Sequence, residues 1–184
     1  MSPRYVPECI DRVLLSEETI ARRVQELGAA IAEDYAGRDL RLVTVLKGGL
    51  FFLADLCRAV TMPLEVDFMA VSTYADGMPG AVRITKDLDD AIEGAAVLVV
   101  EDIIDTGMTL NYVLHNLRSR QPESLEVCTL LDKDVRRIVD IPVAYCGFSI
   151  PDRFVVGYGL DNHGLLRNLP YVASLRDEAV VPGC

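Results

Sequence analysis

The stretch VLVVEDIIDTGMTL (residues 97–110) joins four aliphatic residues to three carboxylates and a Thr-Gly-Met-Thr turn. A uniformly apolar run is typical of a central parallel strand that is covered on both faces. Carboxylates are costly to desolvate unless something pairs with them. Glu101, Asp102 and Asp105 therefore either lie in solvent or hold a cation or a substrate.

Length and composition limit the class of protein. The 184 residues, about half of them hydrophobic, suit one domain with a substantial core. A net charge of -10 argues against a general nucleic-acid binder, whose affinity depends on Lys and Arg. No run approaches the roughly 18 apolar residues that a membrane span needs, and the first ten residues lack the apolar region of a secretory signal. Five widely spaced cysteines, mostly small hydrophobes, indicate a reducing compartment, so a cytoplasmic protein is expected.

Alternating strand and helix patterns predict an α/β sheet with right-handed crossovers. An apolar stripe that follows Ser16 and ends near Gly37 predicts the first helix. Further helices are expected at 50–60 and from about Thr109, and the glycine-containing segment 75–82 is expected to be a mobile loop. The expected strands are 41–46, 64–74, 96–100 and 125–131, followed by short strands at 143–148, 154–159 and 171–175. The short strands predict a small appended subdomain.

The turn DTGMT leads into a helix at the carboxyl edge of the sheet, where open parallel sheets bind their ligands. A glycine-containing turn at a helix N-terminus presents free N–H groups, and Thr106 and Thr109 add hydroxyls, which predicts a phosphate pocket. It is not a Walker A loop, because the second Gly and the Lys of that motif are missing. The adjacent acids Glu101 and Asp102 suit ribose hydroxyls and Mg²⁺. The alternative is an exposed acidic loop with a helix cap.

The opening stretch resembles the phosphoribosyl-pyrophosphate (PRPP) motif of type I phosphoribosyltransferases, in particular their 6-oxopurine branch. The other similar stretches, in the family's order and spacing, are LKGG (46–49), STY (72–74), LLDKD (130–134), FVVGYGLD (154–161) and RNLPY (167–171). The resemblance covers roughly residues 40–175. It implies a central, mainly parallel sheet flanked by helices, with a small hood subdomain and a flexible active-site loop. One domain would span residues 1–184, with the hood built from the N-terminal segment and about 150–184.

The resemblance implies transfer of a 5-phosphoribosyl group from PRPP to N9 of hypoxanthine and/or guanine, which gives IMP or GMP and pyrophosphate. Carried over by position, Glu101 and Asp102 would hold the ribose hydroxyls, directly or through Mg²⁺, and Asp161 would be a further metal contact. Asp105 would be the general acid/base near the purine N7 and would also line the PRPP site. The residues that would wrap the 5'-phosphate are Thr106, Gly107, Met108 and Thr109.

The same resemblance implies a purine site. Lys133, one of only three lysines, would donate to the exocyclic O6 and favour 6-oxopurines over adenine. Phe154 would stack on the purine, the Val155 carbonyl would meet its other edge, and Asp161 would lie beside it. The residue types alone favour an exposed lysine at position 133 and a core aromatic at position 154, whereas the rarity of lysine and the Asp-Lys-Asp context favour the purine role for Lys133.

The resemblance also implies a pyrophosphate site and a flexible lid. Lys47, Gly48 and Arg167 would receive pyrophosphate, with a cis Leu46–Lys47 peptide; otherwise KGG is a plain strand-to-helix turn. The flexible lid would contain Ser72, Thr73 and Tyr74. Family members are usually dimers or tetramers, so a homo-oligomer is expected.

The sequence departs from the family's pattern at two positions, and two alternative functions compete with the purine-salvage interpretation. Asn162 stands where family members commonly carry an aromatic residue, and Met108 cannot donate a side-chain hydrogen bond. One alternative is a phosphoribosyltransferase for xanthine or uracil, although the context of Lys133 and Phe154 speaks against uracil. The other is a regulator that binds nucleotide and RNA without turnover, which the acidic charge and the presence of Asp105 fit poorly.

Overall fold

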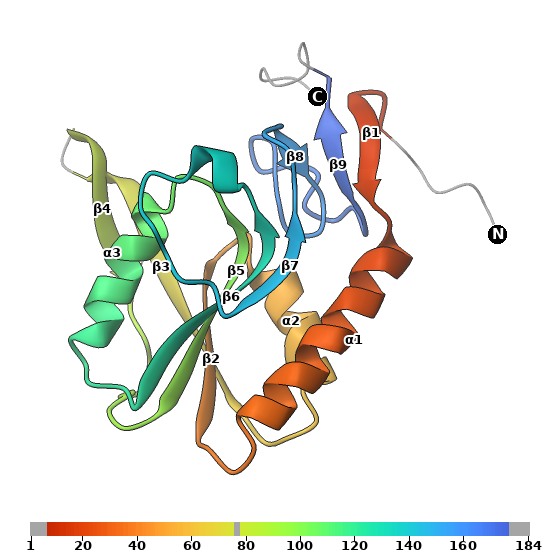
Figure 1. Ribbon diagram of the computed structural model, residues 1–184. Helices are drawn as coiled ribbons and strands as arrows, with labels where there is room; N and C mark the ends of the chain where they lie inside the picture. The colour runs from red at the N-terminus through yellow and green to blue at the C-terminus, as the bar shows by residue number, and fades with distance from the viewer. Residues whose placement is uncertain (1–6, 76–77, 177–184) are drawn as a thin grey trace.

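The computed structural model describes residues 7–75 and 78–176, and Figure 1 shows their arrangement. The elements in chain order are β1 (Ile10–Leu15), α1 (Glu17–Asp34), β2 (Leu40–Leu46), α2 (Leu50–Ala59), β3 (Glu65–Ala75), β4 (Met78–Lys86), β5 (Ala96–Ile104), α3 (Met108–Arg118), β6 (Ser124–Asp132), the 3-10 turn η1 (Asp134–Arg136), β7 (Tyr145–Ser149), β8 (Val155–Val156) and β9 (Val172–Leu175).

The main sheet has six strands in the order β4-β3-β2-β5-β6-β7. Every neighbouring pair is parallel except β3 and β4, so only the edge strand β4 runs the other way. The carboxyl ends of β2, β5 and β6 consequently meet at one edge of the sheet. The expectation of a mainly parallel α/β sheet is confirmed.

Strand β5 is packed on both faces, which explains its uniformly apolar sequence. Leu98 and Val100 are buried in the core that contains α1 and α2, whereas Val97 and Val99 are buried in the core that contains α3. Successive side chains of a strand point to opposite faces, so one apolar run supplies both cores. Burial of each such side chain contributes about 1.5–3 kcal/mol.

Helix α1 begins where the sequence predicts. The Ser16 hydroxyl accepts a hydrogen bond from the Thr19 backbone N–H at 3.2 Å and so caps the helix. Ile20, Val24 and Ile31 are buried on one stripe. These side chains pack into the core that also contains residues of α2, and Figure 1 shows α1 and α2 on the same side of the sheet.

Several element boundaries predicted from the sequence are wrong: the strand expected at 154–159 is only Val155–Val156, and two further differences lie in β4 and β5. Residues 78–82, expected in a mobile loop, belong to β4, which pairs antiparallel with β3 as far as Ala75↔Met78. The partner strand supplies backbone hydrogen bonds that outweigh the local turn signals, and Pro79 is tolerated because β4 is an edge strand. Residues 76 and 77 of the expected loop lie outside the described residues. Strand β5 also continues past Val100 to Ile104, because β6 pairs with it as far as Ile104↔Asp132.

A second, smaller sheet has the order β1-β9-β8, and we propose that it is the hood that the resemblance implies. It combines the N-terminal strand with two strands from the last part of the described chain, and it has its own apolar cluster around Val156 and Ala173. The sequence patterns did not predict β1 as a strand. The extent of the domain from 1 to 184 stays a prediction.

The state of the cysteines in the described ranges bears on the expectation of a reducing compartment. Cys57, Cys128 and Cys146 carry free thiols, whereas Cys9 is disulfide-bonded, which the expectation of reduced cysteines did not include. In these same ranges no helix is both long and apolar enough to cross a bilayer.

Helices α1 and α2 approach closely at Gly28. A methyl group added there would lie 2.6 Å from the Ala59 Cβ and 2.7 Å from the Ala59 carbonyl carbon. Gly to Ala inside a helix normally stabilises by about 1 kcal/mol, but we expect Gly28→Ala to destabilise by about 1–3 kcal/mol because the helices must separate. Urea unfolding followed by circular dichroism measures this, with exposed Ala30→Gly as a control for helix propensity. A Gly28→Ala protein more stable than wild type would contradict the packing argument.

Candidate functional site

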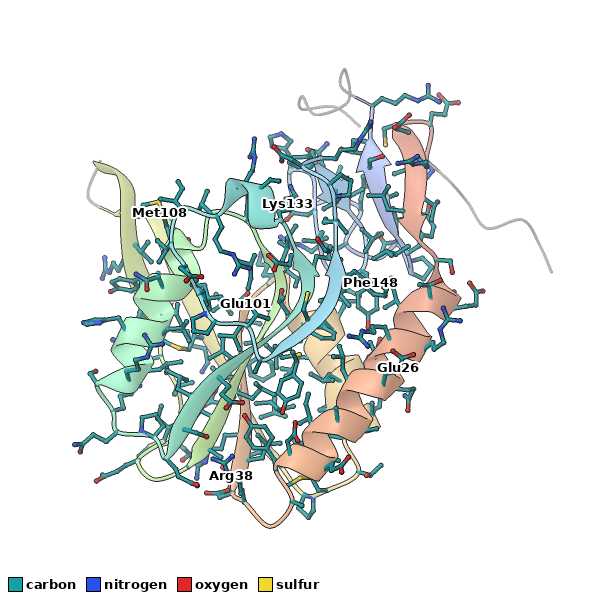
Figure 2. All side chains as sticks on the ribbon, viewed as in Figure 1. Glu26, Arg38, Glu101, Met108, Lys133 and Phe148 are labelled. Carbon is teal, nitrogen blue, oxygen red and sulfur yellow. The ribbon has the colours of Figure 1, made fainter. Side chains whose placement is uncertain are left out.

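A cleft of about 260 Å³ opens at the carboxyl edge of β2 and β5. It brings together residues that the sequence analysis selected from separate segments: Gly48 after β2, Glu101 and Asp102 on β5, and Asp105 and Thr106 before α3. Gly107 and Thr109 also line it, but Lys47 and Met108 do not. Figure 2 labels Glu101, Met108 and Lys133 on the ribbon.

The glycines beside this cleft permit a close approach of three backbone segments. A methyl group on Gly48 would overlap with the Asp102 carboxylate, and one on Gly159, whose φ is +101°, would overlap with the Gly48 carbonyl. The Leu46–Lys47 peptide that leads into this turn is cis, as the resemblance implies. The turn is therefore pressed against both β5 and the segment that follows β8.

The two acids on β5 occupy a poorly solvated position. Burial raises the pKa of Glu101 well above its usual range, and the neighbouring Asp102 charge raises it further. Burial also raises the pKa of Asp102 to about 6, although its carboxylate accepts a hydrogen bond from the Ile103 N–H at 2.8 Å. Desolvated adjacent carboxylates favour a cationic partner, because a positive charge offsets both the burial and their mutual repulsion.

This donor set fits Mg²⁺ in the way that nucleotide enzymes hold it, with one or two carboxylates and the remaining oxygens from substrate and water. Within residues 7–75 and 78–176, no group of three or more His, Cys, Asp and Glu side chains forms a complete metal cage. Asp161, the third expected ligand, pairs with Arg167 at 2.5 Å and accepts a hydrogen bond from the Gly164 N–H at 2.6 Å. Asp161 and Arg167 both act electrostatically on Asp102, so they lie near it.

The loop before α3 has the geometry expected of an anion cradle. Gly107 has a φ of +80° and occupies the N-cap position of the helix, where N–H groups and the positive end of the dipole face outward. The Thr106 carbonyl accepts hydrogen bonds from the N–H groups of Ile138 at 3.0 Å and Val139 at 3.3 Å, which anchors the loop from behind. Met108 is largely exposed at the start of the helix.

Asp105 lies between the acid pair and this loop. Its Oδ1 atom is buried without a hydrogen-bond partner among the described residues, and its Oδ2 atom lies 3.7 Å from Nη1 of Arg136. This oxygen therefore has an unused acceptor position, in a residue that lines the cleft.

The exposure of Lys133 and of Phe154 is the opposite of what each residue type predicts. The Lys133 N–H donates to the Ile104 carbonyl at 3.0 Å, which places the residue beside Asp105, and its side chain is only 8 % exposed. Phe154, by contrast, is 43 % exposed, although the neighbouring Val155 is buried. Lys133 is therefore not a solvated surface lysine, and Phe154 is not a core aromatic.

Asn162, which stands where family members commonly carry an aromatic residue, lies in a tight turn between Asp161 and Leu165. Asn162 and Leu165 exchange backbone hydrogen bonds of 3.1 and 3.0 Å around a tight turn in which His163 and Gly164 both have positive φ. Asn162 is buried, and His163 is exposed. The Arg167 guanidinium donates to the Gly159 carbonyl at 2.5 Å and so ties this turn to the segment beside Gly48.

Some expected residues lie elsewhere, and two relevant residues were not expected. Ser72, Thr73 and Tyr74 lie on β3, near the end of the β3–β4 hairpin, and Ser72 does not line the cleft. Arg136 and Asp152, which the sequence analysis did not select, pair with each other at 2.8 Å beside Asp105 and Lys133. The only sequence signal for Arg136 is the charged run DKDVRR, and nothing marks Asp152.

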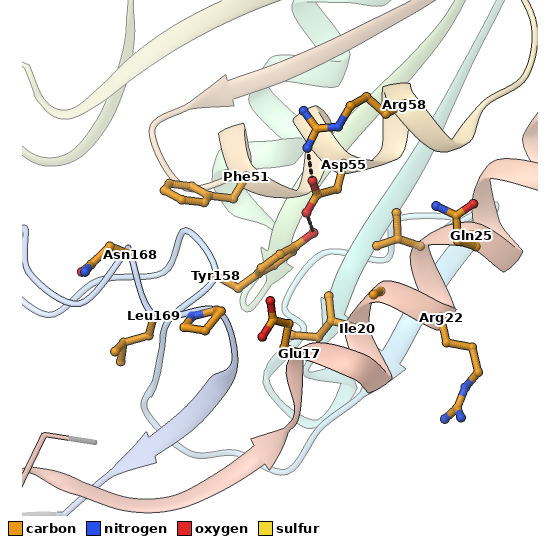
Figure 3. A pocket seen from close by; sticks show the side chains of 13 residues that line it. Glu17, Ile20, Arg22, Gln25, Phe51, Asp55, Arg58, Tyr158, Asn168 and Leu169 are labelled. Carbon is orange, nitrogen blue, oxygen red and sulfur yellow. Dashed lines mark hydrogen bonds and ion pairs between the residues drawn. The ribbon is translucent and has the colours of Figure 1, made fainter. Parts of the chain in front are cut away.

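A larger cavity of about 580 Å³ lies between α1, α2 and the segment around Tyr158 (Figure 3). Its polar contacts are internal: the Tyr158 hydroxyl donates to Asp55 at 2.6 Å, and Asp55 pairs with Arg58. None of the expected site residues lines it. Its chemistry does not match the carboxylate and phosphate-loop arrangement of the smaller cleft.

The fold and this cleft define a phosphoribosyltransferase, and residues 13–163 match the family described as the phosphoribosyl transferase domain. The chain belongs to that family. It is 52% identical over 167 residues to the hypoxanthine phosphoribosyltransferase of Salmonella typhimurium, covering 89% of this chain and 94% of the relative. It is 48% identical over 177 residues to the hypoxanthine-guanine phosphoribosyltransferase of Mycobacterium avium, covering 92% and 87%. A crystal structure of the hypoxanthine phosphoribosyltransferase of Staphylococcus aureus is similar with a TM-score of 0.89 and 47% identity, covering 92% of this chain and 94% of that one.

The raised pKa of Asp102 gives a stability prediction. The folded protein holds a proton on Asp102 up to about pH 6, whereas the unfolded chain releases it near pH 4, so the group lowers stability as pH rises through this window. We expect Asp102→Asn, which keeps the acceptor for the Ile103 N–H, to stabilise the metal-free protein at pH 8 by on the order of 1–3 kcal/mol. At pH 4.5 the gain should be much smaller.

Urea denaturation in EDTA at both pH values measures this difference. Asp140→Asn, at an exposed acid, is the control and should change stability by less than about 0.5 kcal/mol. An Asp102→Asn protein that is less stable at pH 8 than wild type would show that burial does not disfavour this charge.

Proposed function

We propose that the protein is a purine-salvage enzyme that transfers the 5-phosphoribosyl group from PRPP to N9 of hypoxanthine and/or guanine and releases pyrophosphate. The relatives named above support the substrate class. The observation that carries the proposal is the convergence in one region of a desolvated acid pair, a helix N-terminus and a buried lysine. The products would be IMP and GMP.

PRPP would lie along the cleft. Its 5'-phosphate would occupy the loop from Thr106 to Thr109, where backbone N–H groups face outward at the start of α3. Its ribose hydroxyls would meet Glu101 and Asp102, whose oxygens line the same cleft. The raised pKa values of these acids support this placement, because hydroxyl donors and a cation relieve their desolvation.

Mg²⁺ held by Glu101, Asp102 and the oxygens of PRPP would stabilise the negative charge that develops on pyrophosphate as it leaves. Asp161 would join this set only after its carboxylate turns from Arg167, with which it is paired. Lys47, the Gly48 backbone and Arg167 would receive the pyrophosphate. The exposed ammonium of Lys47 would approach it from the rim of the cleft.

In the reaction, a bond forms between purine N9 and C1 of the ribose, and the bond from C1 to pyrophosphate breaks with its electron pair leaving on pyrophosphate. The purine loses one proton overall. Asp105 would handle that proton at N7, because the residue lines the cleft and its Oδ1 atom has no hydrogen-bond partner among the described residues. Closure of the β3–β4 hairpin, which carries Ser72, Thr73 and Tyr74, would exclude water from the reacting carbon.

The purine would bind between Lys133 and Phe154. The Lys133 ammonium would donate to O6, which 6-oxopurines offer as an acceptor and adenine replaces with a donor amino group. The exposed ring of Phe154 would stack on the base, the Val155 carbonyl would accept from its other edge, and Asp161 would lie nearby. This arrangement favours hypoxanthine and guanine, with xanthine as the alternative that the assay below decides.

The setting of the enzyme belongs to the same proposal. We place it in the cytoplasm on the basis of the free thiols of Cys57, Cys128 and Cys146. A homo-oligomer, either a dimer or a tetramer, that binds neither nucleic acid nor membrane is the expected form. Size-exclusion chromatography with light scattering measures the oligomer.

One assay tests the function directly. Protein, PRPP and Mg²⁺ are incubated with hypoxanthine, guanine, xanthine, adenine or uracil, and nucleotide and pyrophosphate are measured. Product with hypoxanthine or guanine, and little with adenine or uracil, is the expected result. Absence of product with every purine would refute the proposal.

Asp105→Asn tests the proton-transfer role. General acid/base catalysis is worth roughly 10²–10⁴-fold, so kcat should fall by about that factor while the Kd for PRPP changes less than about threefold. The control is Asp140→Asn, at an exposed loop acid, which should leave both values unchanged. Equal losses in kcat and PRPP affinity would assign Asp105 to binding instead.

Lys133→Ala tests base recognition. Loss of a charge-assisted hydrogen bond of about 1.5–3 kcal/mol should raise the purine KM by roughly 10–100-fold and leave the PRPP KM unchanged. Lys86→Ala is the matched control, because the Lys86 ammonium pairs with Asp89 at 3.1 Å and does not line the cleft. A purine KM that stays at the wild-type value in Lys133→Ala would remove this assignment.

A further inference from the structure

Arg136 and Asp152 connect the groups proposed for base recognition and proton transfer. One carboxylate oxygen of Asp152 lies 3.9 Å from Nζ of Lys133, and the other accepts a hydrogen bond from Nε of Arg136 at 2.8 Å. Nη1 of Arg136 lies 3.7 Å from Oδ2 of Asp105. Asp105, Arg136, Asp152 and Lys133 thus alternate in charge, and we call them the four-residue ionic network.

Asp152 is the acidic partner that the described structure gives to the Lys133 ammonium. The Lys133 side chain is 8 % exposed, and a buried cation is costly unless an anion lies close to it. The separation of 3.9 Å exceeds a normal hydrogen-bond length. The ammonium protons are therefore held by charge attraction near Asp152 while they stay able to donate to another acceptor.

The backbone fixes Asp152 between the sheet and the exposed aromatic. Two residues before it, the Ile150 N–H donates to the Asp132 carbonyl at the end of β6 at 3.0 Å. Two residues after it, Phe154 accepts a hydrogen bond at its carbonyl from the Leu175 N–H at 3.3 Å. Asp152 consequently has a defined place beside both Lys133 and Phe154, even though its side chain is 42 % exposed.

Arg136 extends the same restraint to Asp105. Its hydrogen bond to Asp152 and the charges of Asp152 and Asp105 raise the pKa of the Arg136 guanidinium, so it is charged at all working pH values. At 3.7 Å it attracts the Asp105 carboxylate without occupying its Oδ1 atom.

We propose that Asp152 is a positioning residue for base recognition, which aims the Lys133 ammonium at the exocyclic oxygen of a 6-oxopurine and, through Arg136, restrains the Asp105 carboxylate. The inference rests on the proposed function and adds to it a residue that does not itself touch the purine. A neutral side chain at position 152 leaves the buried ammonium without its counter-charge, so its orientation and its donor strength both decline.

Steady-state kinetics of Asp152→Asn test the positioning role. The KM for hypoxanthine and guanine should rise at least fivefold, whereas the KM for PRPP should stay within twofold. Asp11→Asn is the matched control: Asp11 has a similar exposure of 45 % and pairs with Arg153 at 3.3 Å, outside the ionic network. Asp152→Glu, which keeps the charge, should recover part of the purine affinity.

A double variant separates positioning from a general structural effect. In a Lys133→Ala background, Asp152→Asn should produce no further increase in purine KM, because the residue through which it acts is gone. Losses that multiply would overturn the proposal, since they would show that Asp152 affects the purine independently of Lys133.

Thermal unfolding gives a readout that does not require turnover. Asp152→Asn should lower Tm because it leaves a buried cation unpaired, and Lys133→Met added to it should restore Tm. If the wild type is active and the kinetics of Asp152→Asn equal those of Asp11→Asn, the positioning role is overturned and the proposed function stays intact. Wild type that forms no nucleotide with any purine would overturn both.

Discussion

The desolvated acid pair at the end of β5 is the constraint on which the rest of the site depends. Glu101 and Asp102 follow directly on strand residues that are buried in two cores, which fixes the backbone of both acids at the edge of the sheet. The glycines at 48 and 159 allow the neighbouring backbone to close over Asp102, which increases its desolvation. A site of this kind costs stability in the empty protein and returns it when cation and hydroxyl groups bind.

Around this pair, each segment contributes a different chemical group. The α3 N-terminus presents backbone N–H groups, the turn after β2 places backbone beside Asp102, and the segment after β6 carries the buried Lys133. Parallel strands make this possible because their carboxyl ends meet at one edge, although β2, β5 and β6 are far apart in sequence. The arrangement is rigid in its core and open at its rim, where Phe154 and Met108 are exposed.

Much of the fold was predictable because its signals are local. The Ser16 cap, the stripe of α1 and the apolar run of β5 each depend on residues within one element. The strand β4 was missed because its pairing with β3 is a tertiary effect that outweighs Gly and Pro in residues 78–82. In the site, the acids and the loop from Thr106 to Thr109 carry a sequence motif, whereas Arg136 and Asp152 are joined to the site by ion pairs between distant segments that no local pattern encodes. The burial of Asn162 likewise follows from the tight turn at His163 and Gly164.

The division of the site between segments also affects how its specificity can change. Lys133, Asp152 and Phe154 all come from the stretch between β6 and β8, whereas the acid pair and the anion cradle come from β5 and α3. Asp105 and Arg136 are the point at which these two groups meet. Under the proposed assignment, substitutions in the β6–β8 stretch would alter which base is accepted while the sugar-phosphate end keeps its geometry, so the sites for the two substrates would be open to separate evolution and separate redesign.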